Sequence, residues 1–116
     1  MRAPFSLLVC LLLLMLQAPL SAQADPGLAI IARLGQLNGL ALHCKALGET
    51  RKMKRALVRN LPKRRQLGEL FDLETHQSFM RFMQEDGTCP SAASLEQKVG
   101  EAITELEAIY RDVRPD

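Results

Sequence analysis

Beyond about residue 26, apolar residues recur at spacings of three and four, which is the period of an amphipathic helix. The first such segment covers residues 27–47. Its apolar positions follow one another at spacings of 4, 3, 4 and 3 and therefore share one helix face: Ile30, Leu34, Leu37, Ala41 and Cys44. Gly48 follows the segment, and glycine is the usual residue just past a helix end. The pattern therefore predicts a helix that stops at Gly48.

Two glycines lie inside this first segment, Gly35 and Gly39, four positions apart on a neighbouring face. Each costs a helix about 1 kcal/mol relative to alanine. Close approach of a second helix is the expected reason for them. A ligand resting on bare backbone is the alternative.

The second predicted helix covers residues 49–61, with Thr50 as its cap and Met53, Leu57 and Leu61 on one face. The sequence Asn60-Leu61-Pro62 predicts a break, because the residue before a proline is pushed out of the helical region. Pro62 is expected in the first turn of the next helix. That third helix covers residues 63–84, and its apolar stripe consists of Leu67, Leu70, Phe71, Ser78, Phe79 and Phe82.

Residues 85–88 are typical of a turn, and a fourth helix is predicted over residues 90–113. Its apolar positions form a seam close to a heptad repeat: Ala92, Leu95, Val99, Ala102, Leu106, Ile109 and Val113, widened by Ile103 and Tyr110. Ser94 and Gln97 fit a capping box, although Thr88 or Ser91 could instead mark the start.

No segment alternates apolar and polar residues as a strand does, and the connections between the four segments are short. Short connections imply antiparallel neighbours. The sequence therefore predicts an all-α fold: a small antiparallel bundle of about four helices, forming a single domain over residues 25–116.

Residues 1–24 have the order of a secretory signal peptide: a positive start at Arg2, a leucine-rich run, and small residues at Ala22 and Ala24. The apolar run is about 12 residues, whereas a membrane-spanning helix needs about 20. We therefore expect residues 1–24 to be cleaved, no stable membrane span afterwards, and a periplasmic or secreted protein. Cys10 lies inside the apolar run, which argues against lipoprotein processing.

Two cysteines remain after cleavage, Cys44 and Cys89. An even pair in an exported chain favours a disulfide over two buried thiols. This bond would join the end of the first helix to the start of the fourth. The chain has no C-x-x-C motif, so thiol–disulfide exchange is not expected.

The formal net charge is only +2, but the charges are unevenly distributed. Eight basic residues occur within residues 51–65 with no acid among them: Arg51, Lys52, Lys54, Arg55, Arg59, Lys63, Arg64 and Arg65. Acids outnumber bases over residues 85–116. A surface for an acidic protein or an envelope polyanion is one interpretation. A solvated helix face paired with the last helix is the other.

Other chemistry has less support in the sequence. Aromatic residues make up 4% of the chain, which argues against nucleic-acid binding by stacking. His76, Met80 and Met83 share a helix face and could bind Cu(I), but the interpretation preferred here is that the methionines fill core gaps and His76 lies on the surface. No catalytic motif occurs, so we expect no enzyme, no metal and no cofactor.

The order of motifs is Leu34-Gly35-x-Leu37 before Cys44, then the basic helix, then Arg65-x-Leu67-Gly68-x-x-Phe71 before Cys89. This order resembles small, mostly uncharacterised exported helical proteins of Gram-negative bacteria with one cysteine pair. That resemblance implies a periplasmic location. In size, export and helicity the chain is also similar to small periplasmic immunity proteins against toxins that degrade the cell wall.

The sequence therefore predicts a non-enzymatic exported binding protein that uses the basic residues. An inhibitor or immunity protein against a cell-wall-active toxin, or an envelope assembly factor, is the alternative.

Overall fold

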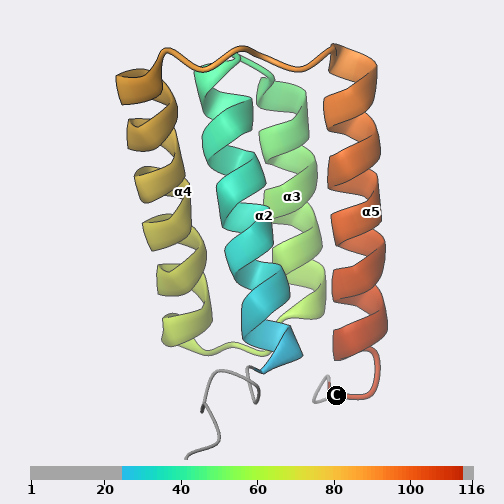
Figure 1. Ribbon diagram of the computed structural model, residues 1–116. Helices are drawn as coiled ribbons and strands as arrows, with labels where there is room; N and C mark the ends of the chain where they lie inside the picture. The colour runs from blue at the N-terminus through green and yellow to red at the C-terminus, as the bar shows by residue number, and fades with distance from the viewer. Residues whose placement is uncertain (1–24, 114–116) are drawn as a thin grey trace, which may run out of the picture.

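The computed structural model describes residues 25–113 and shows four helices with no strand among them (Figure 1). The helices are α2 (Pro26–His43), α3 (Leu47–Asn60), α4 (Arg65–Glu85) and α5 (Ala92–Tyr110). Consecutive helices run in opposite directions. The prediction of an all-α antiparallel bundle is confirmed. The predicted leader, residues 1–24, lies outside the described residues.

The first helix begins as its sequence suggests and ends earlier than predicted. The Asp25 side chain accepts a hydrogen bond of 2.8 Å from the Gly27 amide and caps the N-terminus of α2. The helix ends at His43 because Lys45 adopts a left-handed conformation, with φ of 58°. Gly48, predicted to end this helix, lies instead in the first turn of α3. The left-handed position therefore falls on a lysine and not on a glycine.

The ends of α3 are also only partly as predicted. Thr50, the expected cap, is a buried residue inside the helix, whose N-terminus has no side-chain cap. The break at Asn60-Leu61-Pro62 is confirmed, since Leu61 is extended with φ of −81° and ψ of 141°. Pro62, however, lies in the connection and not in the first turn of α4, which begins at Arg65.

The last helix resolves the choice among its candidate caps. The Ser91 side chain accepts a hydrogen bond of 3.1 Å from the Ser94 amide, so Ser91 is the cap. The predicted seam is buried along its centre, at Leu95, Val99, Ala102 and Leu106 together with Tyr110. Its two ends, Ala92 and Val113, are exposed.

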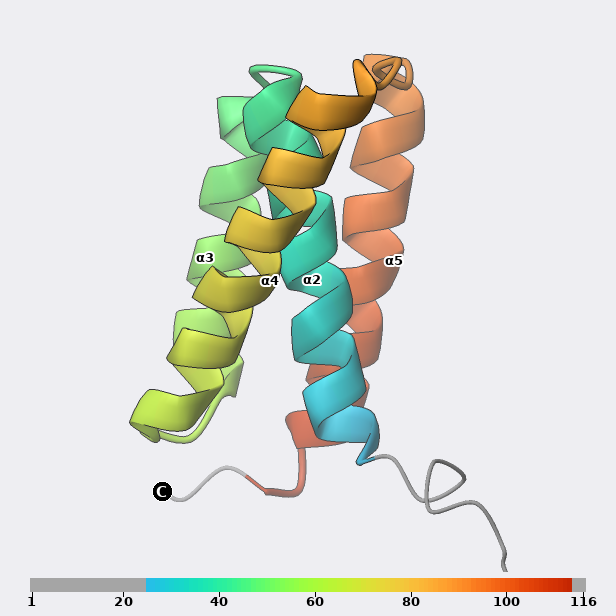
Figure 2. The ribbon, with the colours of Figure 1, turned by 60° about the vertical axis from the view of Figure 1, so that its left-hand side comes forward.

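Helix α2 is the centre of the bundle. It contacts each of the other three helices, and its most extensive contact is with α4. Eight of its 18 residues are buried, against three of the 21 residues of α4. Among the described helices α4 contacts α2 alone, whereas α3 and α5 also contact each other. Figure 2 shows α4 lying over α2, with α3 and α5 on either side.

The contact between α2 and α4 depends on Gly35 and Gly39. A Cβ atom on Gly35 would lie 2.6 Å from the Glu74 Cβ, and one on Gly39 would lie 2.6 Å from the Ser78 Cβ. Both distances are shorter than real Cβ contacts. The glycines therefore let two parallel helices meet backbone to backbone, which confirms close helix approach as the reason for them.

Hydrogen bonds fix α4 in register on α2 at this contact. The hydroxyl of Ser78, a buried residue, donates to the Gln36 carbonyl at 2.8 Å, so a side chain of one helix bonds the backbone of the other. The Asn38 amide donates to the Thr75 hydroxyl at 3.2 Å. Small polar side chains suit a contact this close, because larger ones would separate the backbones.

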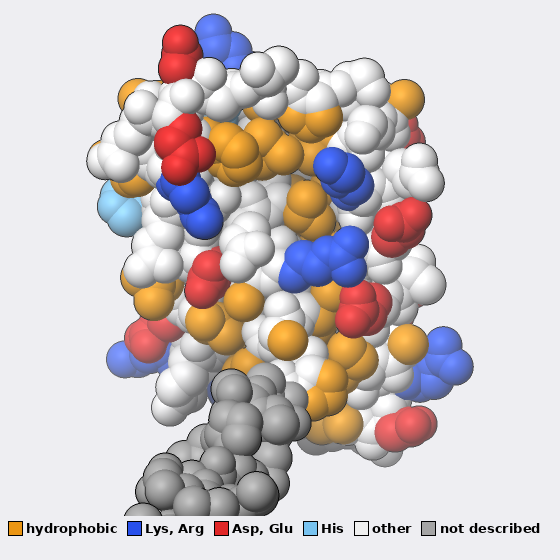
Figure 3. Space-filling model, in the orientation of Figure 1, with side chains coloured by type: hydrophobic (Ala, Val, Ile, Leu, Met, Phe, Trp, Pro, Cys, Tyr) orange, Lys and Arg blue, Asp and Glu red, His pale blue; other side chains and the backbone are white. Residues whose placement is uncertain are grey.

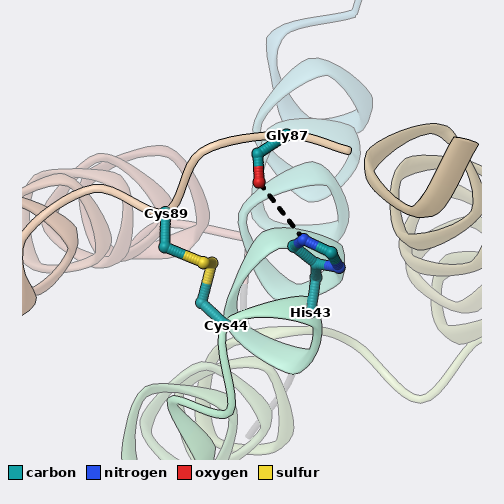
Figure 4. The surroundings of a disulfide bond; sticks show 4 residues. All are labelled: His43, Cys44, Gly87 and Cys89. Carbon is teal, nitrogen blue, oxygen red and sulfur yellow. Dashed lines mark hydrogen bonds between the residues drawn. A yellow bond between two sulfur atoms is a disulfide. The ribbon is translucent and has the colours of Figure 1, made fainter. Parts of the chain in front are cut away.

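The predicted disulfide is present between Cys44 and Cys89, with Sγ atoms 2.08 Å apart (Figure 4). It ties the end of α2 to the connection between α4 and α5. His43 adds two contacts at the same end of the bundle. Its ring stacks on that of Phe82, with ring centroids 5.9 Å apart, and its Nε2 lies 3.3 Å from the Gly87 carbonyl oxygen. These contacts hold the connection against the bundle.

We predict that Gly39→Ala lowers the free energy of unfolding by about 1–3 kcal/mol, the usual cost of overpacking, because the new methyl group meets α4 backbone atoms. Gly100→Ala is the control. It also lies inside a helix, but a Cβ there has nothing within 4 Å. That variant should gain about 0.5–1 kcal/mol. Urea unfolding followed by circular dichroism measures both, and equal effects would contradict the close contact.

Removing the disulfide by Cys44→Ser with Cys89→Ser should cost about 4 kcal/mol on the chain-entropy estimate for a separation of 45 residues. The physical reason is the larger freedom of the unfolded chain. Urea unfolding of the wild-type protein with and without reductant, beside the double variant, measures this cost. A double variant as stable as the oxidised protein would contradict the expectation.

Candidate functional site

The eight predicted basic residues, here called the basic surface, are all exposed. Five lie on α3, namely Arg51, Lys52, Lys54, Arg55 and Arg59. Lys63 and Arg64 lie in the connection that follows, and Arg65 is the first residue of α4. The structure therefore places the basic surface on one helix and the connection at its end.

Two apolar residues share the exposed side of α3 with these bases. Leu47, Arg51, Lys54 and Val58 follow one another at spacings of 4, 3 and 4, so they form one line along the helix, here called the α3 stripe. Val58 is 84% exposed and Leu47 is 53% exposed. Burial of Met53, Ala56 and Leu57 on another face of α3 explains why the stripe faces solvent.

Sequence analysis did not identify these two residues as part of the site. Val58 directly follows Leu57 and therefore lies outside the buried face of the helix. That position in the sequence is a sign that Val58 is exposed. Leu47 belongs to the first predicted helix, residues 27–47, whose predicted end lies beyond the observed end at His43. The stripe becomes visible only once both residues are assigned to α3.

Lys52 of the basic surface pairs with the last helix. Its ammonium group lies 3.0 Å from a Glu49 carboxylate oxygen and 3.6 Å from one of Glu96 on α5. The hydrogen bond with Glu49 is the main reason that the pKa of Lys52 is raised above its usual value. Desolvation opposes that rise, and the charges of both carboxylates add to it.

Most of the basic surface has no such partner. Within residues 25–113, six of its members form no ion pair: Arg51, Lys54, Arg55, Lys63, Arg64 and Arg65. Arg55 and Arg59 line a hollow between α3 and α5 together with Glu107. Pairing with the last helix therefore accounts for one edge of the basic surface and not for its exposed centre.

A hollow of about 400 Å³, here called the junction hollow, lies at the connection between α3 and α4. Its walls combine apolar residues with three consecutive bases: Leu57, Val58, Leu61, Pro62, Lys63, Arg64, Arg65, Leu67 and Gly68. Helix α4 begins here with no side-chain cap and no acid in its first turn. Bases at a helix N-terminus are unfavourable because they meet the positive end of the helix dipole.

A larger hollow, of about 600 Å³, lies over α2 in the space between α4 and α5. Figure 3 shows hydrophobic side chains gathered there between the two outer helices. Its apolar lining consists of Leu37, Leu40 and Phe82. Its charged residues have both signs: Arg33, Arg81, Lys98 and Glu101. Arg33 also bonds Glu105 across to α5 at 3.1 Å. This hollow lacks the single sign of the basic surface.

The methionines of α4 are not core residues, and that interpretation was wrong. Met80 and Met83 are 40% and 57% exposed, and His76 is exposed as well. The reason is that α4 packs against α2 alone, so its outer face meets no other described helix. Among residues 25–113, no group of three or more His, Cys, Asp or Glu side chains could hold a metal ion.

Comparisons of the chain with protein-family models, with curated proteins and with solved structures found no match. Within the described residues, none of the helices has both the length and the apolar character needed to cross a bilayer.

Arg64 of the basic surface lies at the same end of the bundle as Tyr110, where α2 begins and α5 ends. Both residues line a hollow of about 500 Å³ that also includes Asp25 and Gly27. Gly27 leaves room for the phenol, since a Cβ there would lie 2.5 Å from its oxygen. Burial raises the pKa of Tyr110 above its usual value, the Asp25 charge adds to this rise, and Arg64 opposes it.

We therefore predict that Tyr110 ionises above pH about 10, its ordinary value. Above that pH the unfolded chain loses the phenol proton while the folded protein retains it, so stability falls as pH rises through the folded pKa. Phenolate absorbance reports Tyr110 alone, because the chain has one Tyr and no Trp. Tyr110→Phe should remove this part of the pH dependence. Ionisation at or below pH about 10 would contradict the burial.

Proposed function

We propose that this protein is an exported, non-enzymatic binding protein whose basic surface docks on an acidic partner in the periplasm or outside the cell. The leader pattern and the disulfide support export, since disulfides persist in oxidising compartments. The partner class is an acidic protein or an envelope polyanion.

One observation carries this proposal: six bases lie exposed and close in sequence with no ion pair in the described chain. They are Arg51, Lys54, Arg55, Lys63, Arg64 and Arg65. Like charges held close together repel one another, and an approaching anion relieves that repulsion. A partner with complementary charge is therefore favoured on this surface over any other part of the described molecule.

Helix α3 suits such a role because it is rigidly held from behind. Met53 is fully buried, and Ala56, Leu57 and Asn60 are also buried, so the helix cannot rotate away from its position. The charged side chains are then presented in a fixed arrangement. Complementary charge of this kind mainly speeds encounter and selects partners. Salt weakens it, since charges are screened over about 8 Å at physiological ionic strength.

We predict that Lys54→Glu with Arg55→Glu weakens binding to immobilised poly-glutamate by about tenfold or more. Two attractions are lost and two repulsions are added, each of up to about 1 kcal/mol, and 1.4 kcal/mol corresponds to tenfold. Raising the salt concentration should likewise weaken the binding of the wild-type protein to poly-glutamate. Both residues are exposed, so the fold should be unchanged.

The control is Lys98→Glu with Arg111→Glu, which makes the same change in net charge on α5 and the residue just after it. This variant should bind poly-glutamate nearly as well as the wild-type protein. An equal loss in both double variants would mean that net charge alone decides binding. No loss in the α3 variant would show that the basic surface is not the binding site.

A further inference from the structure

The inference here rests on the proposed function and concerns the chemistry of the partner. The basic surface is not uniformly polar, because the α3 stripe places Val58 and Leu47 among the bases. An aliphatic side chain that is 84% exposed contributes nothing to the packing of the bundle. Together with the bases around it, this side chain offers a partner both an apolar contact and positive charge.

Val58 has bases on both sides along the chain. Lys54 and Arg55 lie one turn before it on α3, and Lys63, Arg64 and Arg65 follow it at the junction hollow. Leu61 and Pro62 line the hollow beside it. The centre of this region is thus apolar and its two ends are cationic, and its helical part, from Lys54 to Asn60, is about 9 Å long.

A surface that binds an acidic protein would be expected to have a different residue composition. Protein interfaces are rich in aromatic anchors and combine donors with acceptors in their polar rim. The aromatic residues that the structure describes, Phe71, Phe79, Phe82 and Tyr110, belong to α4 and α5 and not to the α3 stripe. The basic surface itself contains cationic donors and aliphatic groups.

A lipid bilayer with anionic headgroups has the matching arrangement. Its phosphates accept hydrogen bonds from Lys and Arg side chains, and its acyl boundary lies just below them. Helices that bind at such an interface combine a basic polar face with aliphatic groups that enter the boundary. Groups of four to eight bases on such a helix are typical of binding to anionic lipid.

We infer that α3 and the connection to α4 dock on the phosphate headgroups of an anionic lipid bilayer. Val58 enters the boundary between headgroups and acyl chains. Lys54 and Arg55 bind phosphates on one side of it, and Lys63 and Arg65 bind phosphates on the other. The attachment is peripheral and reversible, because its apolar contact is small and its main attraction is electrostatic.

The test uses a fluorescent reporter that the chain does not otherwise contain, since it has no Trp. Val58→Trp places one indole at the proposed contact, in the chain from Asp25 onward, which includes all four described helices. With vesicles of equal parts phosphatidylglycerol and phosphatidylethanolamine, its emission should move to shorter wavelength. Vesicles of phosphatidylcholine alone should leave it unchanged, as should high salt with the anionic vesicles.

The matched control is Leu73→Trp, which replaces another aliphatic residue, 52% exposed, on the outer face of α4. Its emission should not change with either kind of vesicle. Adding Lys54→Glu and Arg55→Glu to the Val58→Trp chain should reduce its partition onto anionic vesicles at least 25-fold, since each base contributes about fivefold near such a surface.

Each other outcome overturns the inference. Equal shifts at positions 58 and 73, or equal binding to phosphatidylcholine, would mean that α3 and its charges do not direct the contact. No shift at position 58 while poly-glutamate still binds would make the partner an acidic protein or polymer, and the proposed function would stand. Failure to bind both vesicles and poly-glutamate would overturn the proposed function as well.

Discussion

The close contact between α2 and α4 determines where most other parts of this molecule can lie. Gly35 and Gly39 remove the side chains that would otherwise keep the two helices apart, and Ser78 then bonds the α2 backbone directly. Because α4 has no other helix to pack against in the described chain, this contact alone positions it. The same contact positions the connection that precedes α4 and contains Lys63 and Arg64.

The opposite end of the bundle is held by covalent and aromatic contacts. The Cys44–Cys89 bond and the stacking of His43 on Phe82 both act on the connection between α4 and α5. These two helices do not contact each other, so the connection spans an open hollow over α2. The disulfide stabilises this small fold, in which α4 packs against α2 alone, because it restricts the freedom of the unfolded chain.

The basic surface depends on how little of α3 is needed for packing. Buried residues such as Met53 and Leu57 hold the helix to α2 and α5. Arg51, Lys54 and Arg55 are exposed and take no part in this packing. Lys52 marks the edge at which α5 begins to neutralise this charge through Glu96. Charge that the fold does not neutralise, next to aliphatic groups that it does not bury, is a cost in the isolated molecule. An anionic surface outside it would remove that cost.

The sequence by itself determined the helices, the break at Asn60-Leu61-Pro62 and the cysteine pair, because these depend on local periodicity, on proline sterics and on the count of cysteines. It also favoured a helix contact at Gly35 and Gly39, because close approach explains their cost, and left a ligand on bare backbone as the alternative. Which helix they meet was decided by tertiary structure, because that depends on how α2 and α4 pack. Tertiary packing also left Met80, Met83 and Val58 in solvent, since a helical period shows which residues share a face but not whether another helix covers it. The end of α2 was also decided by tertiary structure, because the left-handed residue is Lys45 whereas local propensity favours glycine at such a position.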